Sequence, residues 1–301
     1  MSGYFIGLFW NSGEEDFDFT YTDVQKKCES NIINTSKIEQ VNELKTKTLH
    51  VEIHNIRINK INKYFCDLNI EFILFNRCKI ESIENLSKIT GLKKIIFIDC
   101  DIKEFGDFKN SNIEHVSVHS SNISFTDICK LKSLNELHYK SCKNVIHLDE
   151  LTDMKNLLVL DLNDNNIESI EKLAVIDKLI SIDFGNNKIN SIHALEKYDK
   201  LKYVYLNNNN IMDLSYLKNN LSIKFLNVSG NKISNIDLIE KFVDLEFLNV
   251  NNNPIKIIPN LLNFKLLDFD YLKVDWNDIS ELKGMKGYNL IKNIVKSITN
   301  K

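Results

Sequence analysis

Seven histidines are the side chains of this 301-residue chain that best suit metal or proton chemistry. The five that fall where we predict short strands are His50, His54, His115, His119 and His138. Imidazole is a common ligand of zinc and other transition metals. His119 and His138 would approach each other on neighbouring strands, whereas His115 and His119, on one strand, would stand about 13 Å apart. Because no third ligand is evident, we expect no metal site, and interpret these histidines as a solvated surface or one with pH-dependent charge.

No other group of residues has the spacing of a catalytic site. The chain contains no phosphate-binding glycine loop, no HExxH or CxxC motif and no nucleophile elbow. Pairs of acidic residues are common, and in the repeated segments their neighbours explain them as a solvated face. We therefore expect that the protein is not an enzyme, requires no cofactor and has no small-molecule substrate.

Charge and hydropathy exclude two further classes of function. The chain has 38 basic and 41 acidic residues, a formal net charge of −3, which argues against a protein that binds mainly nucleic acid or an anionic membrane. The apolar run Tyr4–Trp10 has no basic segment before it and is followed by acidic residues, unlike a signal peptide. No stretch reaches the roughly 18 apolar residues of a membrane helix. These features favour a cytoplasmic protein.

A repeat of about 22 residues organises most of the chain. Its clearest copies read L-x-x-L-x-L-x-x-N-x-I-x-x-I and begin at Leu157, Leu179, Leu201, Ile223 and Leu245. Weaker copies begin near residues 48, 70, 92, 113 and 134. Cys78, Cys100 and Cys142 replace the asparagine at position 9 of three weaker copies. Since cysteine is small and a weak donor, we expect these thiols to be buried and structural.

The spacing within one copy predicts its local structure. Positions 4 and 6 alternate inward on a short strand, the buried residue at position 9 turns the chain, and isoleucines three residues apart indicate a 3₁₀ or short helical return. One copy cannot bury its apolar edge alone, so neighbouring copies must stack. The predicted fold is an α/β repeat: a curved solenoid with a parallel concave sheet, a short helical or 3₁₀ convex side and terminal caps.

Three regions follow from this interpretation. Residues 1–47 are an N-terminal cap, with a hairpin formed by 4–10 and 17–22 and a loosely periodic helix near 32–44. Residues 48–275 are the solenoid of about ten repeats. Residues 276–301 are a C-terminal capping helix, whose apolar face includes Tyr288 and Ile291.

The repeated motif resembles the leucine-rich repeat superfamily. The 22-residue copy with two isoleucines after its asparagine is similar to the repeats of the leucine-rich-repeat regulator of protein phosphatase 1 and of bacterial internalins. The resemblance implies a protein-binding scaffold whose contacts come from positions 3, 5 and 7 of each strand. Members of the superfamily share this scaffold and differ in what they bind.

Those strand positions carry the candidate partner-binding residues. Position 3 of the later copies forms an aromatic column, Tyr203, Phe225 and Phe247. Position 5 carries Asp161, Asp183, Tyr205, Asn227 and Asn249. Apolar anchors beside polar groups are typical of protein interfaces, although ladders of like residues can also stabilise a sheet. We favour binding for the aromatic column and leave both interpretations open for the acidic one.

Upstream copies add Glu136, His115, His119 and His138 to this candidate surface. Asp161, Asp183 and Glu136 would favour a basic patch on a protein partner. The predicted function is a non-catalytic protein–protein interaction that regulates or scaffolds a cytosolic enzyme. The alternative is a cytosolic immunity or inhibitor protein that neutralises a toxin or host factor. An exported, internalin-like adhesin is disfavoured by the lack of a signal peptide.

Overall fold

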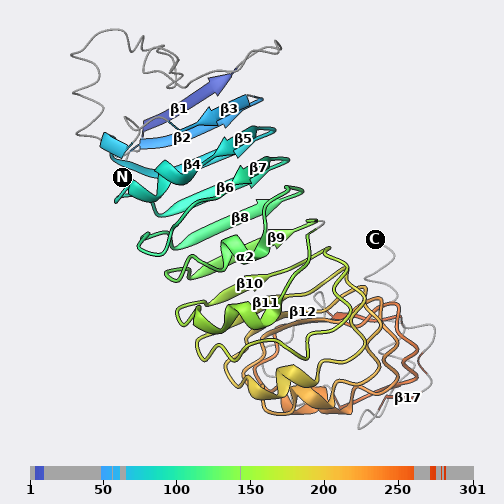
Figure 1. The fold of residues 1–301 in the computed structure, drawn as a ribbon. Helices are drawn as coiled ribbons and strands as arrows, with labels where there is room; N and C mark the ends of the chain where they lie inside the picture. Colours follow the sequence, from blue (N-terminus) through green and yellow to red (C-terminus); the bar gives the residue numbers. More distant parts are fainter. Residues whose placement is uncertain are drawn as a thin grey trace. The chain divides into compact units, whose positions relative to one another are not determined.

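The computed structural model describes residues 4–9, 49–55, 57–61, 66–142, 144–260, 272–275, 279 and 281–282. The chain divides into two compact units, which we call unit 1 (Met1–Leu157) and unit 2 (Leu158–Lys301). In each unit the chain winds through successive coils, and each coil adds one short strand to a parallel sheet (Figure 1). The strands recur at the spacing of the sequence repeat.

Unit 1 contains a long parallel sheet and a smaller one beside it. The main sheet has the order β1 (Tyr4–Phe9), β2 (Leu49–His54), β4 (Ile70–Asn76), β6 (Lys94–Ile98), β8 (His115–His119) and β9 (Glu136–Lys140). The smaller sheet contains β3 (Arg57–Lys60), β5 (Lys79–Ser82) and β7 (Asp101–Glu104). The returns between coils include the 3₁₀ helices η3 (Glu84–Lys88) and η4 (Leu148–Asp153) and the short helix α2 (Phe125–Ile128).

Unit 2 has shorter strands and repeats more regularly. Its main sheet has the order β10 (Val159–Asp161), β11 (Ser181–Asp183), β12 (Tyr203–Tyr205), β13 (Phe225–Asn227), β14 (Phe247–Asn249) and β16 (Leu272–Lys273). The returns carry the 3₁₀ helices η5 (His193–Lys197), η6 (Ser215–Leu217) and η7 (Asp237–Lys241). Among the described residues, β15 (Ile257–Ile258) and β17 (Glu281–Leu282) form a separate parallel pair.

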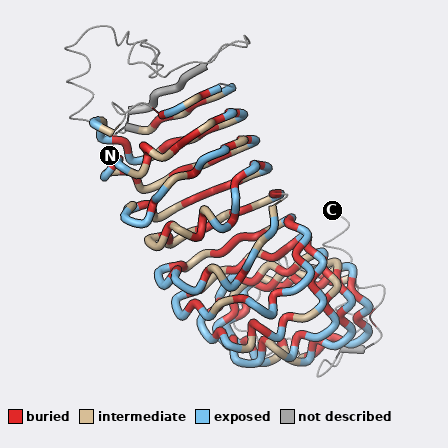
Figure 2. Tube along the Cα trace, viewed as in Figure 1, coloured by how far each residue is buried: buried red, intermediate tan, exposed pale blue. Residues whose placement is uncertain are grey.

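The core of each unit consists of the apolar positions that the repeat predicts to point inward. In one coil of unit 2, Leu201, Val204 and Leu206 are all fully buried. In unit 1, the rings of Phe75 and Phe97, from neighbouring strands, stack with centroids 5.5 Å apart. Buried and exposed residues alternate along every coil, as Figure 2 shows. Neighbouring coils therefore bury each other's apolar edges, as predicted.

A residue with left-handed backbone follows the strand in each coil, at position 8 of the repeat. These residues are Asn55, Arg77, Asp99, Ser120, Ser141, Asp164, Asn186, Asn208, Gly230 and Asn252. Their φ angles lie between 50° and 66°. A left-handed residue reverses the chain sharply, and asparagine and glycine tolerate it best. This conformation brings the next residue, at position 9, back over the core.

The position 9 side chains form the predicted ladder through the coils. The amide nitrogen of Asn187 donates hydrogen bonds of 3.0 Å to the carbonyls of Leu162, Phe184 and Gly185. Its amide oxygen accepts from the backbone N–H groups of Asn165 and Ile167. Asn209, Asn231 and Asn253 donate in the same pattern. One buried amide thus satisfies five backbone groups that the bend leaves unpaired.

Cysteine takes over the donor half of this arrangement in unit 1. The thiols of Cys78 and Cys100 donate, at 3.4 Å each, to the carbonyls of Ile53 and Phe75 in the preceding coil. Cys78, Cys100 and Cys142 are buried and free of disulfides. The prediction that these thiols are structural is confirmed.

The ends of the chain are described only in part. Strand β1 pairs in parallel with β2, so Tyr4–Phe9 forms an additional strand of the main sheet, which the repeat did not predict. The second hairpin strand (17–22) and the helix near 32–44 lie outside the described residues. Strand β17 lies within 276–301, for which a capping helix is predicted, and the helical face at 288–298 lies outside the described residues.

Candidate binding surface

The solvent-facing side of each main sheet, which we call the sheet face, carries positions 3, 5 and 7 of the repeat. In unit 2 the parallel register aligns Tyr203 with Phe225 and Phe225 with Phe247. It aligns Asp183 with Tyr205, and Asn227 with Asn249. The two predicted columns are therefore present, because one repeat advances the chain by one strand without a shift in register.

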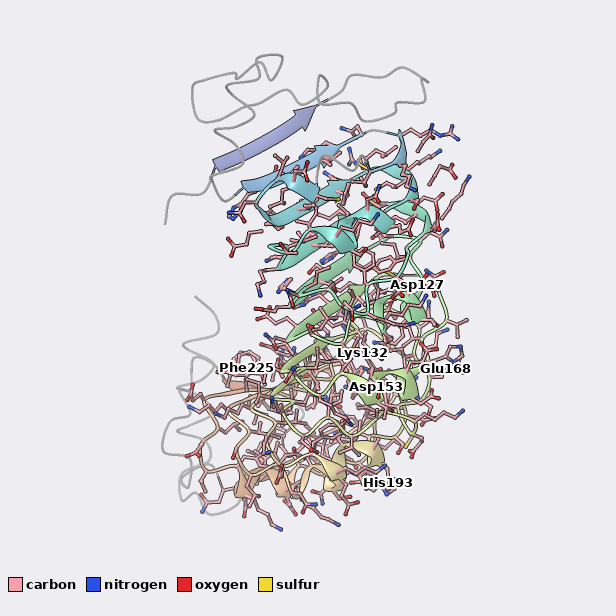
Figure 3. All side chains as sticks on the ribbon, turned by 60° about the vertical axis from the view of Figure 1, so that its left-hand side comes forward. Asp127, Lys132, Asp153, Glu168, His193 and Phe225 are labelled. Atoms are coloured by element: carbon pink, nitrogen blue, oxygen red, sulfur yellow. The ribbon has the colours of Figure 1, made fainter. Side chains whose placement is uncertain are left out.

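Four aromatic side chains of these columns form what we call the aromatic ladder: Tyr203, Tyr205, Phe225 and Phe247. The rings of Tyr205 and Phe225 lie 5.0 Å apart, and those of Phe225 and Phe247 stack in parallel at 3.8 Å. Tyr203 is 40% exposed, and the other three are half-buried against one another. A continuous apolar surface therefore crosses three neighbouring strands. In Figure 3, Phe225 and His193 lie on opposite sides of the coils of unit 2.

The phenol of Tyr205 adds a polar group to this ladder. Partial burial raises its pKa, and the nearby carboxylate of Asp183 raises it further. The phenol is therefore neutral at physiological pH and can donate a hydrogen bond. Asp183 in turn accepts a 3.1 Å hydrogen bond from the amide of Asn163.

The acidic and amide residues of position 5 have a structural use. A side-chain oxygen of Asp161, Asp183, Asn227 and Asn249 accepts the backbone N–H two residues later, at 2.8–3.2 Å. This local bond ends each strand and prepares the left-handed turn. Asp161 is only 5% exposed. Its predicted availability to a basic partner is therefore wrong, because its carboxylate is buried beside its own turn.

The sheet face of unit 1 gathers three other predicted residues, which we call the histidine–glutamate cluster: His115, Glu136 and His138. His115 Nδ1 lies 2.6 Å from Glu136 Oε2, and His138 Nε2 lies 4.0 Å from the same oxygen. The two imidazole rings are 5.3 Å apart. The repeat spacing predicts that His138 approaches His119, without a third ligand. In the structure Glu136 is the third donor, and His119 lies opposite Lys140 in the sheet register.

The surroundings of this cluster affect its protonation. Burial lowers the pKa of His115, and the nearby Lys94 lowers it further, while Glu136 acts in the opposite direction. Lys94 lies opposite His115 in the register of β6 and β8, and its ammonium lies 5.8 Å from the ring centre of Phe72. The other two predicted histidines of this sheet lie on β2. His50 is near Glu71, and His54 is near Glu52.

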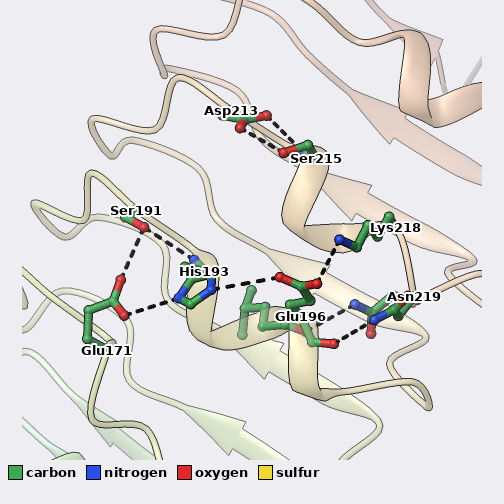
Figure 4. A network of polar contacts seen from close by, with 10 residues as sticks. Glu171, Ser191, His193, Glu196, Asp213, Ser215, Lys218 and Asn219 are labelled. Atoms are coloured by element: carbon green, nitrogen blue, oxygen red, sulfur yellow. Dashed lines mark hydrogen bonds and ion pairs between the residues drawn. The ribbon is translucent and has the colours of Figure 1, made fainter.

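The exposed side chains of the returns on the other side of unit 2 form a network of polar contacts. His193 lies between Glu171 and Glu196, at 3.5 Å and 3.8 Å, and Glu196 pairs with Lys218 at 2.7 Å (Figure 4). Ser191 donates to Glu171 and accepts the backbone N–H of His193. These contacts join three successive coils.

Several basic residues of both units are paired with acids. Lys93 lies 2.5 Å from Glu114, and Lys224 lies 2.8 Å from Glu246. In unit 1, Lys132 pairs with Asp153 at 3.1 Å, also labelled in Figure 3. This pairing agrees with the dispersed charges of the sequence. Among the described residues, no helix has the length and apolar character needed to cross a membrane.

Comparisons with known proteins identify the fold. No family model matches the chain, and no curated protein matches its sequence. Among solved structures, an internalin (InlF) of Listeria monocytogenes is 18% identical, with a TM-score of 0.54 over 85% of this chain and 91% of that one. A leucine-rich repeat protein of Leptospira interrogans is 17% identical, with a TM-score of 0.56 over 83% and 69% of the two chains.

A third similar structure is the complex of TLR13 with ssRNA13. It is 22% identical, with a TM-score of 0.54, and the match covers 83% of this chain and 38% of that chain. At these sequence identities the similarity concerns the fold alone, and the coils described above agree with it. The chain folds as a leucine-rich repeat solenoid.

Proposed function

We propose that this solenoid is a non-catalytic module that binds another protein through the sheet face of unit 2. The aromatic ladder carries this proposal. The rings of Tyr205, Phe225 and Phe247 contact one another, and Tyr203 lies beside Phe225 in the sheet register. The four residues therefore form one aromatic strip on the solvent side of the sheet, where their outer faces contribute nothing to the core. Exposed apolar strips of this kind commonly mark interaction surfaces.

The chemistry of the ladder suits a protein partner. Tyrosine is enriched among residues that dominate binding energy, because a rigid ring buries a large area and its hydroxyl still forms a hydrogen bond. Asp183, Asn227 and Asn249 border the rings and would supply the polar edge of the interface. The carboxylate of Asp183 favours a lysine or arginine on the partner. Within this proposal, the module regulates or scaffolds a cytosolic enzyme.

Site-specific photo-cross-linking tests the proposal directly. A benzophenone amino acid would replace Tyr203 in one variant and Tyr216 in a control, and both would be irradiated in native cell lysate. Tyr216 is a suitable control because it lies on η6, away from the sheet, and also packs against another ring, that of His193. Adducts would be identified by mass spectrometry, with and without ribonuclease.

We expect the probe at Tyr203 to capture a discrete protein that the probe at Tyr216 does not. Adding Phe225→Ala should abolish that adduct. Identical adducts at both positions, or an adduct removed by ribonuclease, would contradict the proposal. If a captured partner is an enzyme, its rate with and without the purified module would then test the regulatory role.

A further inference from the structure

The histidine–glutamate cluster in unit 1 brings three metal-ligating side chains together on two neighbouring strands. Glu136 and His138 are two residues apart on β9, so their side chains leave the same face of the sheet. His115 lies directly opposite Glu136 on β8, and His138 lies opposite Ser117. The parallel register therefore places the three side chains at the corners of a small triangle.

The donor atoms of this triangle converge closely. All three side chains offer a ligand atom within 4.8 Å of the others. Around a tetrahedral ion with bonds of about 2.0–2.2 Å, ligand atoms lie roughly 3.4 Å apart. Side-chain rotations that move the ligand atoms by about 1–2 Å would therefore give the tetrahedral spacing, without any change in the strands.

From this geometry we propose that His115, Glu136 and His138 bind a divalent transition-metal ion of the zinc type. Two imidazole nitrogens and one carboxylate oxygen suit such an ion better than calcium or magnesium, which prefer oxygen ligands. Three protein ligands leave a fourth position for water. The ion would replace the proton that His115 and Glu136 share across their 2.6 Å contact.

The strands beneath the cluster are anchored in the core, which favours a preformed site. Val116 and Leu137, the residues beside these ligands on β8 and β9, are completely buried in the core of unit 1. The donors are thus fixed at their Cα positions, and only side-chain torsions remain to be adjusted. Lys94 opposes cation binding, but its ammonium lies near the ring of Phe72 on β4, on the other side of β6.

Another pair in the same sheet provides a matched control. Glu52 and His54 on β2 have the same spacing as Glu136 and His138, and their side chains approach within 3.3 Å. Among the described residues, a third donor lies near Glu136 and His138 but not near Glu52 and His54. His54→Ala should therefore leave metal binding intact, whereas His138→Ala should remove it. This inference is independent of the proposed function, because the aromatic ladder belongs to unit 2.

Isothermal titration of zinc chloride into untagged, chelator-treated full-length protein tests the proposal. We expect one saturable site in the wild type and in His54→Ala. Glu136→Gln and His138→Ala should each weaken binding at least tenfold, because each removes one of three ligands. Cobalt(II) added to the same proteins should give the visible absorption of a tetrahedral site only where zinc binds.

The melting temperatures of the metal-free variants separate the loss of a metal ligand from a loss of folding. Both ligands are partly exposed, so circular dichroism should show the same melting temperature for each variant as for the metal-free wild type. Zinc should raise the melting temperature of the wild type and His54→Ala only. The absence of a saturable site, or equal affinity in His54→Ala and His138→Ala, would overturn the proposal.

Discussion

The ring of Phe225 lies parallel to the ring of Phe247, with the two centroids 3.8 Å apart. The two residues occupy the same position of successive repeats and are paired in the sheet register. Each ring therefore covers one face of the next, while its edge stays open to solvent. This stacking explains why these residues are half-buried although they lie on the outside of the sheet.

Phe225 and its neighbour Leu226 test which side of β13 carries the core. Leu226 is fully buried, so Leu226→Ala should lower the free energy of unfolding by about 2–5 kcal/mol through the cavity it creates. Phe225→Ala loses mainly its contacts with the rings of Tyr205 and Phe247, which are worth about 0.5–1.5 kcal/mol each. Urea unfolding of both variants measures the difference. Equal losses would show that the two faces are assigned incorrectly.

The repeat alone predicts the aromatic columns because each copy advances the chain by one strand. Tyr203, Phe225 and Phe247 are one period apart, so parallel pairing must align them. Burial of individual side chains is harder to predict. Asp161 and Asp183 hold the same position, yet only Asp161 is buried, since exposure depends on what the neighbouring side chains cover.

The histidine–glutamate cluster shows a second limit of sequence reasoning. His138 lies between His115 and His119 in the register, so either diagonal contact was compatible with the repeat. The choice depends on side-chain torsions, which the spacing of residues does not specify. The left-handed turn was missed for a related reason. Residues as different as Arg77 and Gly230 occupy it, because the geometry of the coil, rather than one residue type, imposes the conformation.

Asn187 should be among the most sensitive polar residues of the solenoid. Its buried amide serves five backbone groups, and Asn187→Ala would leave several of them unpaired at a cost of about 1–3 kcal/mol each. We expect a loss of about 3 kcal/mol or more in urea unfolding. Asn190→Ala, at an exposed position of the same coil, should change stability by less than about 0.5 kcal/mol.

Replacement of Asn187 by cysteine refines this prediction. Cys78 and Cys100 show that a thiol at this position reaches the carbonyl of the preceding coil. Asn187→Cys should therefore retain part of the stability that Asn187→Ala loses. A cysteine variant no more stable than the alanine variant would mean that the acceptor oxygen supplies nearly all of the asparagine's contribution.

The left-handed turn predicts an unusual order of substitutions at Asn186, whose φ is 55°. Valine is strained in this region by about 1–2 kcal/mol, whereas glycine adopts it freely. Both substitutions remove the same exposed hydrogen bonds with Asn163 and Asn208. The difference in stability between the two variants therefore reports mainly the cost of the left-handed backbone. Thermal unfolding should show Asn186→Gly to be more stable than Asn186→Val. The reverse order would contradict a left-handed backbone at this residue.

Cys129 should resist alkylation for as long as unit 1 stays folded. Burial, together with the smaller effect of the nearby Glu150, raises the pKa of its thiol to about 12. Only about one thiol in 10,000 would be ionised at pH 8, and the thiolate is the reactive form. Labelling with iodoacetamide, followed by peptide mass spectrometry, should modify Cys129 only in urea. Raising the pH from 8 to 9 in native buffer should leave Cys129 unlabelled. Rapid labelling of the native protein would contradict the prediction and show that this part of the coil opens readily.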